Sequence, residues 1–261
     1  MSLAPEQVIL EFERVAFTYQ RDHDFIKELT FSIANGEFIG LLGANGSGKS
    51  TILKLASGIL APSHGSIKLW GRPLQSYKNK DKAKLLCYLP QLLDINIPFK
   101  VCELVGMGLY PYDILPEITV TESLEMVGLV EKSESYIKDL SGGEKRRAFL
   151  AMTLLQGAGL VLLDEPLANL DIKYQIEIMR LLRKLQDKKH ISVIMALHDI
   201  NMAFQFERVM VIKDGRIAGM GNPEIVLSGD LLKKAFDVSL DMKKQGAAYM
   251  NMKGLKNLDL L

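Results

Sequence analysis

Hydrophobic and polar residues alternate along the first part of the chain. The alternation from Ile9 to Phe17 and from Phe25 to Ile33 predicts two strands of an antiparallel flank. A turn at Asn35-Gly36 and an unbroken apolar run from Phe38 to Leu42 predict that a further strand follows directly. The chain is therefore expected to open with strands and not with a helix.

Strand and helix patterns alternate in the rest of the chain, which predicts a parallel sheet covered by helices. A helical insert interrupts this alternation from about Leu92 to Ala158, and its clearest helices are Val101 to Leu109 and Val120 to Val127. Other predicted elements are the strands Leu86 to Leu89 and Ser192 to Leu197, the helix Ile200 to Phe206, a hairpin of Val209 to Ile212 with Ile217 to Met220, and a last helix Asp230 to Phe236.

Composition narrows the class of protein. With 261 residues and 48% hydrophobic side chains, the chain can bury one sizeable core. Its net charge of +1 gives no basic field, so no nucleic-acid partner is expected. No apolar run approaches the ~18 residues of a membrane helix and no signal peptide is evident, so membrane association is expected through a partner. We expect Cys87 and Cys102 to be buried thiols.

The first chemical motif follows the apolar run Phe38 to Leu42 and opens into a helical pattern. Glycines at this position let successive backbone N–H groups face phosphate oxygens, and the helix adds its positive end. A Gly-rich turn that holds no ligand would explain the glycines but not Lys49 with Ser50, which are expected to reach the β and γ phosphates and Mg²⁺. The predicted phosphate loop consists of Gly43, Ala44, Asn45, Gly46, Ser47, Gly48, Lys49, Ser50 and Thr51.

The second motif is an apolar strand, Leu160 to Leu163, that ends in Asp164 and Glu165. Two adjacent acids at a strand end can be merely solvated, but beside a phosphate loop they suggest two separate roles. Asp164 would hold Mg²⁺, and Glu165 would polarise the attacking water as the general base.

The third motif, Leu140-Ser141-Gly142-Gly143-Glu144, precedes the amphipathic run Lys145 to Gln156. A capping box of Ser141 and Glu144 explains these two residues as an ordinary helix start. It does not explain Gly142 and Gly143, which suggest that something approaches the backbone closely.

In this order the three motifs resemble the ATP-binding subunit of an ABC transporter, whose signature reads LSGGQ or LSGGE, and the resemblance runs from Val8 to about Val238. It implies an α/β fold with a P-loop NTPase core, built as a mixed sheet with an antiparallel flank, and an inserted α-helical subdomain. Residues 1–261 would form a single ABC ATPase domain. Its nucleotide-binding core would be 1–91 and 159–240, its helical signature subdomain 92–158, and its C-terminal tail, with no role assigned, 241–261.

The resemblance also implies roles for single residues. Tyr19 would stack on adenine, although without the resemblance a half-buried strand tyrosine would be the preferred interpretation. Gln91 would contact Mg²⁺ and join the core to the helical subdomain, and His198 would contact the γ phosphate. The implied catalytic set is Lys49, Gln91, Glu165 and His198, and the implied Mg²⁺ set is Ser50, Gln91 and Asp164. From the partner chain of a homodimer closed on ATP, the implied contacts are Ser141, Gly142, Gly143, Glu144 and Asp171, the last in the loop Ala168 to Asp171.

Segments 97–101, 106–111, 198–203 and 221–226 resemble the subfamily that imports iron siderophores, haem and cobalamin. This implies two membrane permease subunits, an indirectly linked substrate-binding protein, and a place at the cytoplasmic face of a bacterial or archaeal membrane. Two alternatives stay open. One is a non-transport ATPase of the same fold, such as a cofactor-assembly or repair factor, and the other is a regulatory ATP-binding module, which Glu165 and His198 disfavour.

Overall fold

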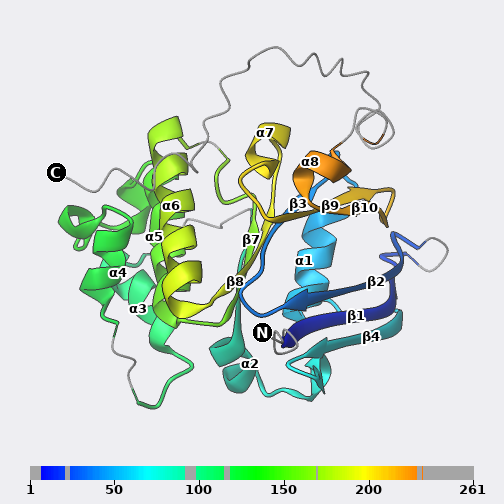
Figure 1. Cartoon of the computed structure of the whole chain (residues 1–261). Coiled ribbons are helices and arrows are strands. Elements are labelled where there is room, and N and C mark those ends of the chain that lie inside the picture. Colours follow the sequence, from blue (N-terminus) through cyan, green and yellow to red (C-terminus); the bar gives the residue numbers. More distant parts are fainter. Residues whose placement is uncertain are drawn as a thin grey trace, which may run out of the picture.

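The computed structural model describes residues 7–20, 24–91, 98–114, 118–168, 170–227 and 231 (Figure 1). The strands are β1 Val8–Phe17, β2 Ile26–Ala34, β3 Phe38–Leu42, β4 His64–Leu69, β5 Arg72–Pro73, β6 Leu86–Leu89, β7 Leu160–Asp164, β8 Ser192–Ala196, β9 Arg208–Lys213 and β10 Arg216–Gly221. The α-helices are α1 Lys49–Ser57, α2 Asn79–Leu85, α3 Val101–Gly106, α4 Val120–Met126, α5 Gly142–Gln156, α6 Ile172–Lys189, α7 Ile200–Ala203 and α8 Pro223–Val226. Short 3₁₀ turns lie at Leu74–Ser76, Met107–Leu109, Val130–Lys132 and Ile137–Asp139.

The strands form two sheets. The smaller one is antiparallel, in the order β2-β1-β4-β5, and confirms the predicted flank. Its inner face is apolar, and the rings of Phe12 and Phe31 stack there with centroids 4.4 Å apart. The strand β4, which the sequence pattern did not predict, pairs with β1 on one side and with the short edge strand β5 on the other.

The larger sheet has six strands in the order β10-β9-β3-β8-β7-β6. All its pairs are parallel except the hairpin of β9 and β10, so the sheet is mixed and the predicted hairpin is confirmed. All residues of β3, β7 and β8 are buried, as expected for parallel strands covered on both faces. The α/β fold with an antiparallel flank is therefore the observed one.

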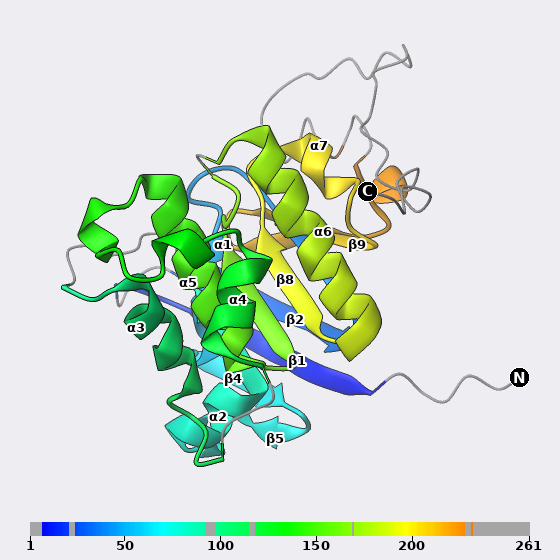
Figure 2. The same ribbon diagram turned by 90° about the vertical axis from the view of Figure 1, so that its left-hand side faces the viewer.

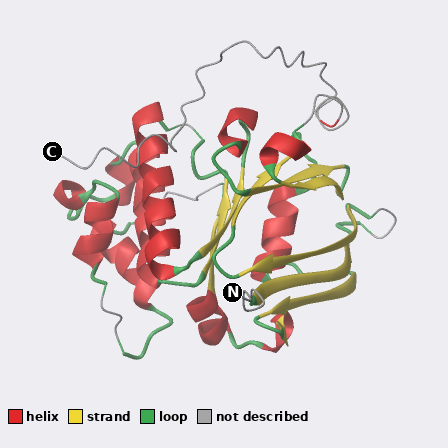
Figure 3. Ribbon diagram, viewed as in Figure 1, coloured by secondary structure: helices red, strands yellow, loops and turns green. Residues whose placement is uncertain are grey.

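Two hydrophobic clusters lie on the two faces of the larger sheet. One joins α1 and the smaller sheet to Ile39, Leu41 and Ile194, and the other joins α3 to α6 with Phe38, Leu42 and Val193. Figures 1 and 2 show α1 on one side of the larger sheet and α5 and α6 on the other. Figure 3 shows helices gathered at one end of the molecule and the antiparallel strands at the opposite end.

The register of the larger sheet positions the candidate site. Leu89 at the end of β6 pairs with Leu163, and Asp164 at the end of β7 pairs with Ala196 of β8. Leu41 of β3 also pairs with Ala196. The carboxyl ends of β3, β6, β7 and β8 therefore meet at one edge, where open α/β sheets bind ligands.

The helical insert departs from its predicted boundaries in detail. The predicted helix Val101 to Leu109 divides into α3 and a 3₁₀ turn, where a Cβ on Gly108 would lie 2.4 Å from the carbonyl oxygen of Met152. This close approach to α5 requires glycine at position 108. Val120 to Val127 corresponds to α4, which begins with a capping box at Thr119.

Several other expectations can be compared with the structure. The predicted helix Ile200 to Phe206 ends at Ala203, because the chain then turns and Phe206 stacks on Phe38. The expectation that Cys102 is buried was wrong: its thiol is partly exposed and donates to Glu134 Oε1 at 3.5 Å. Cys87 is buried, and burial raises the pKa of its thiol to about 12. The 18-residue helix α6 was not predicted as an element.

Some expectations fall on residues outside the described ranges. They concern the start of the insert at 92–97, Asn169, the tail at 241–261 and the predicted helix at 230–236 except for Leu231. Within the described ranges, no helix combines the length and apolar character needed to cross a membrane.

Candidate functional site

The loop between β3 and α1 has backbone conformations that favour glycine. Gly43 has φ 155° and Gly48 has φ 116°, and a Cβ on Gly43 would lie 2.4 Å from the carbonyl oxygen of Ile212. Gly48 is also the N-cap of α1 and offers no capping side chain. The first-turn N–H groups of a helix have no partner within the helix. Here they are suited to an anion.

Lys49 projects back over this loop. Its Nζ donates to the carbonyl oxygens of Gly43 at 2.7 Å and Ala44 at 3.2 Å, and the residue is 5% exposed. Burial lowers the pKa of the ammonium, opposed by the negative charges of Glu165 and Asp164. A buried cation held by neutral carbonyls is well placed to bind a phosphate.

The remaining loop residues surround this lysine. Asn45 and Gly46 are exposed at the tip, whereas Ser47 and Thr51 are buried beneath it. All residues of the predicted loop therefore lie at the carboxyl end of β3, as the sequence motif required.

Asp164 is buried and accepts hydrogen bonds at both carboxylate oxygens. Ser50 Oγ donates to Oδ1 at 3.0 Å, and the hydroxyl of Tyr88 donates to Oδ2 at 3.2 Å. Sequence reasoning missed Tyr88, which reaches the site because β6 pairs with β7 in parallel and sets Tyr88 beside Leu162. Burial and the charge of Asp164 raise the pKa of the Tyr88 phenol, so it remains a donor.

Glu165 has φ 53°, a left-handed conformation that is strained for a residue with a side chain. Its carboxylate is buried and contacts two groups that lie far away in the sequence. Gln91 Nε2 donates to Oε2, and His198 Nε2 lies against the same oxygen. Three of the four predicted catalytic residues therefore meet at the strand ends.

Tyr19 lies beyond the end of β1 and is 57% exposed, so it is not a half-buried strand residue. Its hydroxyl lies 3.0 Å from Thr51 Oγ1 in the first turn of α1, and its ring makes edge contacts with Phe17 and Phe25. The aromatic ring is thus held beside the phosphate loop with much of its surface accessible to solvent.

The signature residues lie on the helical side of the molecule. Ser141 caps α5, and its backbone N–H and hydroxyl both donate to Glu144 Oε2 at 2.8 Å. Gly142 is exposed, and Asp171 is the exposed N-cap of α6. A Cβ on Gly143 would lie 3.3 Å from Leu170, so the signature packs on the loop that precedes α6.

Oxygen ligands for a divalent cation are present in this site. Ser50 Oγ is hydrogen-bonded to Asp164 Oδ1. Gln91 lies nearby, because its side chain is hydrogen-bonded to Glu165, the next residue after Asp164. The described residues contain no group of three or more His, Cys, Asp or Glu that could hold a metal alone. The donor set therefore fits Mg²⁺, which takes few protein oxygens and retains water and phosphate ligands.

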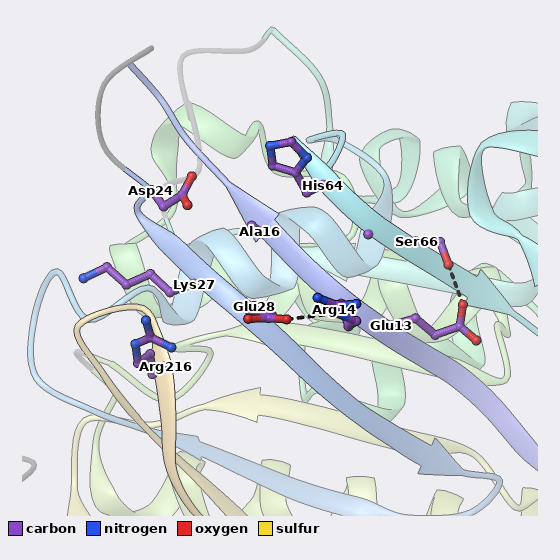
Figure 4. A pocket seen from close by; sticks show the side chains of 10 residues that line it. Glu13, Arg14, Ala16, Asp24, Lys27, Glu28, His64, Ser66 and Arg216 are labelled. Carbon is purple, nitrogen blue, oxygen red and sulfur yellow. Dashed lines mark hydrogen bonds and ion pairs between the residues drawn. The ribbon is translucent and has the colours of Figure 1, made fainter.

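A separate groove of about 820 Å³ lies over the smaller sheet (Figure 4). Charged groups of both signs line it, including Arg14, Glu28, Lys27 and Arg216, and Arg14 pairs with Glu28 at 2.8 Å. No residue of the candidate site lines this groove, so it is distinct from the strand ends.

Comparison with known proteins agrees with this geometry. The sequence profile of the family described as "ABC transporter" matches residues 26–168. A petrobactin import ATP-binding protein of Bacillus anthracis is 37% identical over 225 residues, which cover 83% of each chain. The chain belongs to the ABC transporter family. Since ATP-binding subunits of ABC transporters hydrolyse ATP, it is an ATPase.

Other relatives of this ABC ATPase share most of its length. A hemin import ATP-binding protein of Rhodopseudomonas palustris is 34% identical, covering 90% of this chain and 91% of its own. A solved structure of cbiO1 from Clostridium perfringens, part of an ABC transporter complex, is 30% identical with a TM-score of 0.74, covering 90% and 96% of the two chains. A dimeric ATP-binding cassette bound to ADP and Pi is 25% identical with a TM-score of 0.75, covering 82% and 99%.

Proposed function

We propose that this ABC ATPase powers a membrane importer for a metal chelate such as an iron siderophore, haem or cobalamin. The observation that supports ATP hydrolysis most directly is the buried Glu165 carboxylate, held by Gln91 and His198 beside Asp164 and the phosphate loop. Relatives named for petrobactin, hemin and ferric enterobactin import support the class of cargo.

Binding would be divided between the loop and the strand ends. Lys49 would exchange its bonds to loop carbonyls for the β and γ phosphates, joined by the N–H groups of the first turn of α1. Tyr19 would stack on the adenine. The phosphate-binding residues would be Gly43, Asn45, Gly46, Ser47, Gly48, Lys49, Ser50 and Thr51.

Mg²⁺ would be held by Ser50, Gln91 and Asp164, and when bound it would neutralise charge on the phosphates. Tyr88 keeps the Asp164 carboxylate oriented by donating to the oxygen that Ser50 does not use. A fixed carboxylate needs no reorganisation when the cation arrives.

Glu165 would act as the general base. Its carboxylate would accept the proton of the attacking water, while Gln91 and His198 prevent it from rotating away. His198 would also donate to the γ phosphate, where negative charge develops.

A second copy of the chain would complete the site. Ser141, Gly142, Gly143, Glu144 and Asp171 would reach the partner's nucleotide, since their hydrogen bonds in the described residues do not extend to the phosphate loop of their own chain. The similarity to a dimeric cassette bound to ADP and Pi supports this arrangement. The proposed division is a core of 1–91 and 159–240 with a signature subdomain of 92–158.

The permease contact would lie on the helical insert, at the cytoplasmic face of the membrane. Large apolar side chains are exposed there, with Tyr110 77%, Ile114 87% and Met107 42% accessible. Exposed large apolar side chains of this kind are suited to a protein interface.

Uptake in cells tests this function. A strain that lacks the chain should lose accumulation of a radiolabelled iron chelate, and the wild-type chain but not Glu165→Gln should restore it. The purified wild-type chain should hydrolyse ATP with Mg²⁺ and not with excess EDTA. Hydrolysis with unchanged uptake, and no membrane protein co-purifying with the chain, would favour the non-transport alternative.

A further inference from the structure

Arg146 lies in α5 five residues after the signature serine, and its side chain contacts the turn that bears Glu165. Its Nη2 donates to the carbonyl oxygen of Asp164 and its Nη1 to that of Ala168, both at 3.3 Å. These carbonyls flank a backbone turn. The turn is closed by a hydrogen bond of 3.2 Å from the Ala168 N–H to the carbonyl oxygen of Glu165. One guanidinium therefore spans both ends of the catalytic turn.

The surroundings of Arg146 are unfavourable for a group that serves stability alone. Its Nε is buried, with no hydrogen-bond partner in the part of the chain that the structure describes. Burial lowers the pKa of the guanidinium, while the charges of Glu165 and Asp164 oppose this effect. An unsatisfied buried donor costs free energy, so each such group in a native protein calls for a reason.

We propose that Arg146 is a positioning residue that couples the signature helix to the Glu165 turn of its own chain. The proposal rests on the proposed function, in which Ser141 at the start of the same helix contacts the partner's nucleotide. Since Ser141 and Arg146 belong to one rigid helix, a shift of the helix start moves the guanidinium that holds the turn. Closure over the partner's ATP thereby adjusts the general base at the chain's own site.

The hydrogen bonds of Gln175 and Arg146 support different parts of the loop that follows Asp164. Gln175 of α6 donates to the carbonyl oxygens of Leu170 at 2.9 Å and Leu167 at 3.4 Å, and so supports the later part of the loop. Arg146, in contrast, donates a hydrogen bond to the carbonyl oxygen of Asp164, at the start of the loop. A guanidinium can donate to both carbonyls at once, whereas a lysine offers a single ammonium centre.

The first experiment compares Arg146→Met with Lys145→Met in the full-length chain. Both changes remove one positive charge from neighbouring positions of α5. Arg146→Met should lower kcat by about 10- to 100-fold, the usual effect of losing charge-assisted hydrogen bonds that fix a catalytic group. The KM for ATP should stay within about 2-fold, because the phosphate loop is untouched. Lys145→Met should leave both constants unchanged, and Arg146→Lys should restore little of the lost turnover.

A double-mutant cycle separates positioning from mere support of the helix. If Arg146 acts through Glu165, Arg146→Met should change the residual turnover of a Glu165→Gln chain by less than about 2-fold. Equal losses in both backgrounds would overturn the proposal. So would a rise in KM that accounts for the whole loss in catalytic efficiency.

Amide hydrogen exchange provides a readout that does not depend on hydrolysis. In the nucleotide-free chain, Arg146→Met should speed exchange in the peptide covering residues 164–168, and Lys145→Met should not. Unchanged exchange would show that Arg146 does not hold this turn. If the wild-type chain does not hydrolyse ATP, the proposed function fails, and the exchange comparison still decides whether Arg146 positions the turn.

Discussion

The two helices that follow glycine-bearing motifs begin in opposite ways. The start of α1 is buried, with Lys49 and Thr51 each 5% exposed, and its N-cap glycine offers no capping group. The start of α5 is exposed at Ser141, whose side chain and backbone are bonded to the carboxylate of Glu144. One helix start leaves its donors for an anion, and the other already has an anion from its own chain.

This difference indicates how the two ends can serve one reaction. The end of α1 is complete within a single chain, because the loop, Lys49 and Asp164 lie together in the structure. At the start of α5, Ser141 would bind a partner's phosphate only if the Glu144 carboxylate gave up its bonds to the Ser141 N–H and hydroxyl. The first end can therefore bind a nucleotide within a single chain, whereas Ser141 at the second end is already bonded to Glu144.

The largest effect on turnover is expected at Glu165, where a substitution should stop ATP hydrolysis without preventing ATP binding. Glu165→Gln should lower turnover by about 100- to 10,000-fold, the usual contribution of a general base, and leave ATP binding intact. With both helix ends intact, ATP should then trap a dimer. Turnover of the purified chain and sedimentation with ATP measure the two effects. Near-normal turnover would remove Glu165 from its assigned role.

Mixing two defective chains tests whether the two ends meet across a dimer. Lys49→Ala disables the α1 end and Ser141→Arg the α5 end, and each chain alone should be nearly inactive. A head-to-tail dimer of the two has one intact site, so mixing should restore part of the activity if one site suffices. Turnover should also be followed against protein concentration. A constant rate per chain where sedimentation shows only monomer, with ATP present, would rule out the shared site.

A smaller effect is expected at the adenine. Tyr19→Ala should weaken nucleotide binding by roughly 1 to 3 kcal/mol, the range measured for bases stacked on aromatic side chains. Tyr19→Phe is the matched control, since it keeps the ring and removes only the hydroxyl that lies near Thr51. Titration with a fluorescent ATP analogue measures both variants. Equal affinity of Tyr19→Ala and the wild type would contradict the stacking role.

The smallest effect is expected at the capping carboxylate of α5. Hydrogen bonds from the backbone and hydroxyl of Ser141 lower the pKa of Glu144 from its ordinary value of 4.5. Its stabilising contribution is therefore present above pH 4.5 and is lost as the pH falls through the lowered value. Since Glu144 is partly exposed to solvent, which screens its charge, Glu144→Gln should cost less than about 1 kcal/mol at pH 7.

Urea unfolding at pH 7 and at pH 3 measures the difference in the free energy of unfolding between the wild type and Glu144→Gln. This difference should shrink at the lower pH. Glu122→Gln in the similar capping box of α4 is the matched control. Hydrogen bonds to Thr119 lower the pKa of the Glu122 carboxyl in the wild type, so the stability lost in Glu122→Gln should depend on pH in a similar way. Only Glu144→Gln should alter the ATP-dependent dimer. An equal change in both variants would argue against a contact between Glu144 and the partner's nucleotide.

Much of the fold and the site could be predicted because the relevant residues are adjacent in the sequence. The strand before Gly43, the strand ending in Asp164 and the capping box of Ser141 with Glu144 all appear as predicted. Each depends on local backbone geometry, which consecutive residues set. The alternating strands of the flank were predictable for the same reason.

Helix α6 and strand β4 were not predicted, although their residues form regular elements. The strand β4 has only two fully buried residues, Ile67 and Leu69, and it takes its place by pairing with β1. The partly exposed thiol of Cys102 is a similar case, since a sequence does not show which face of α3 is covered.

The sequence by itself determined the family resemblance, the phosphate loop and the order of the catalytic motifs, since phosphate chemistry constrains neighbouring residues. Only the tertiary structure decided that Gln91 and His198 meet at Glu165, and that Tyr88 and Arg146 hold Asp164 and its turn. These contacts join separate strands and helices. Their geometry depends on the register of β6, β7 and β8 and on how α5 packs, and residues far apart in the chain set both.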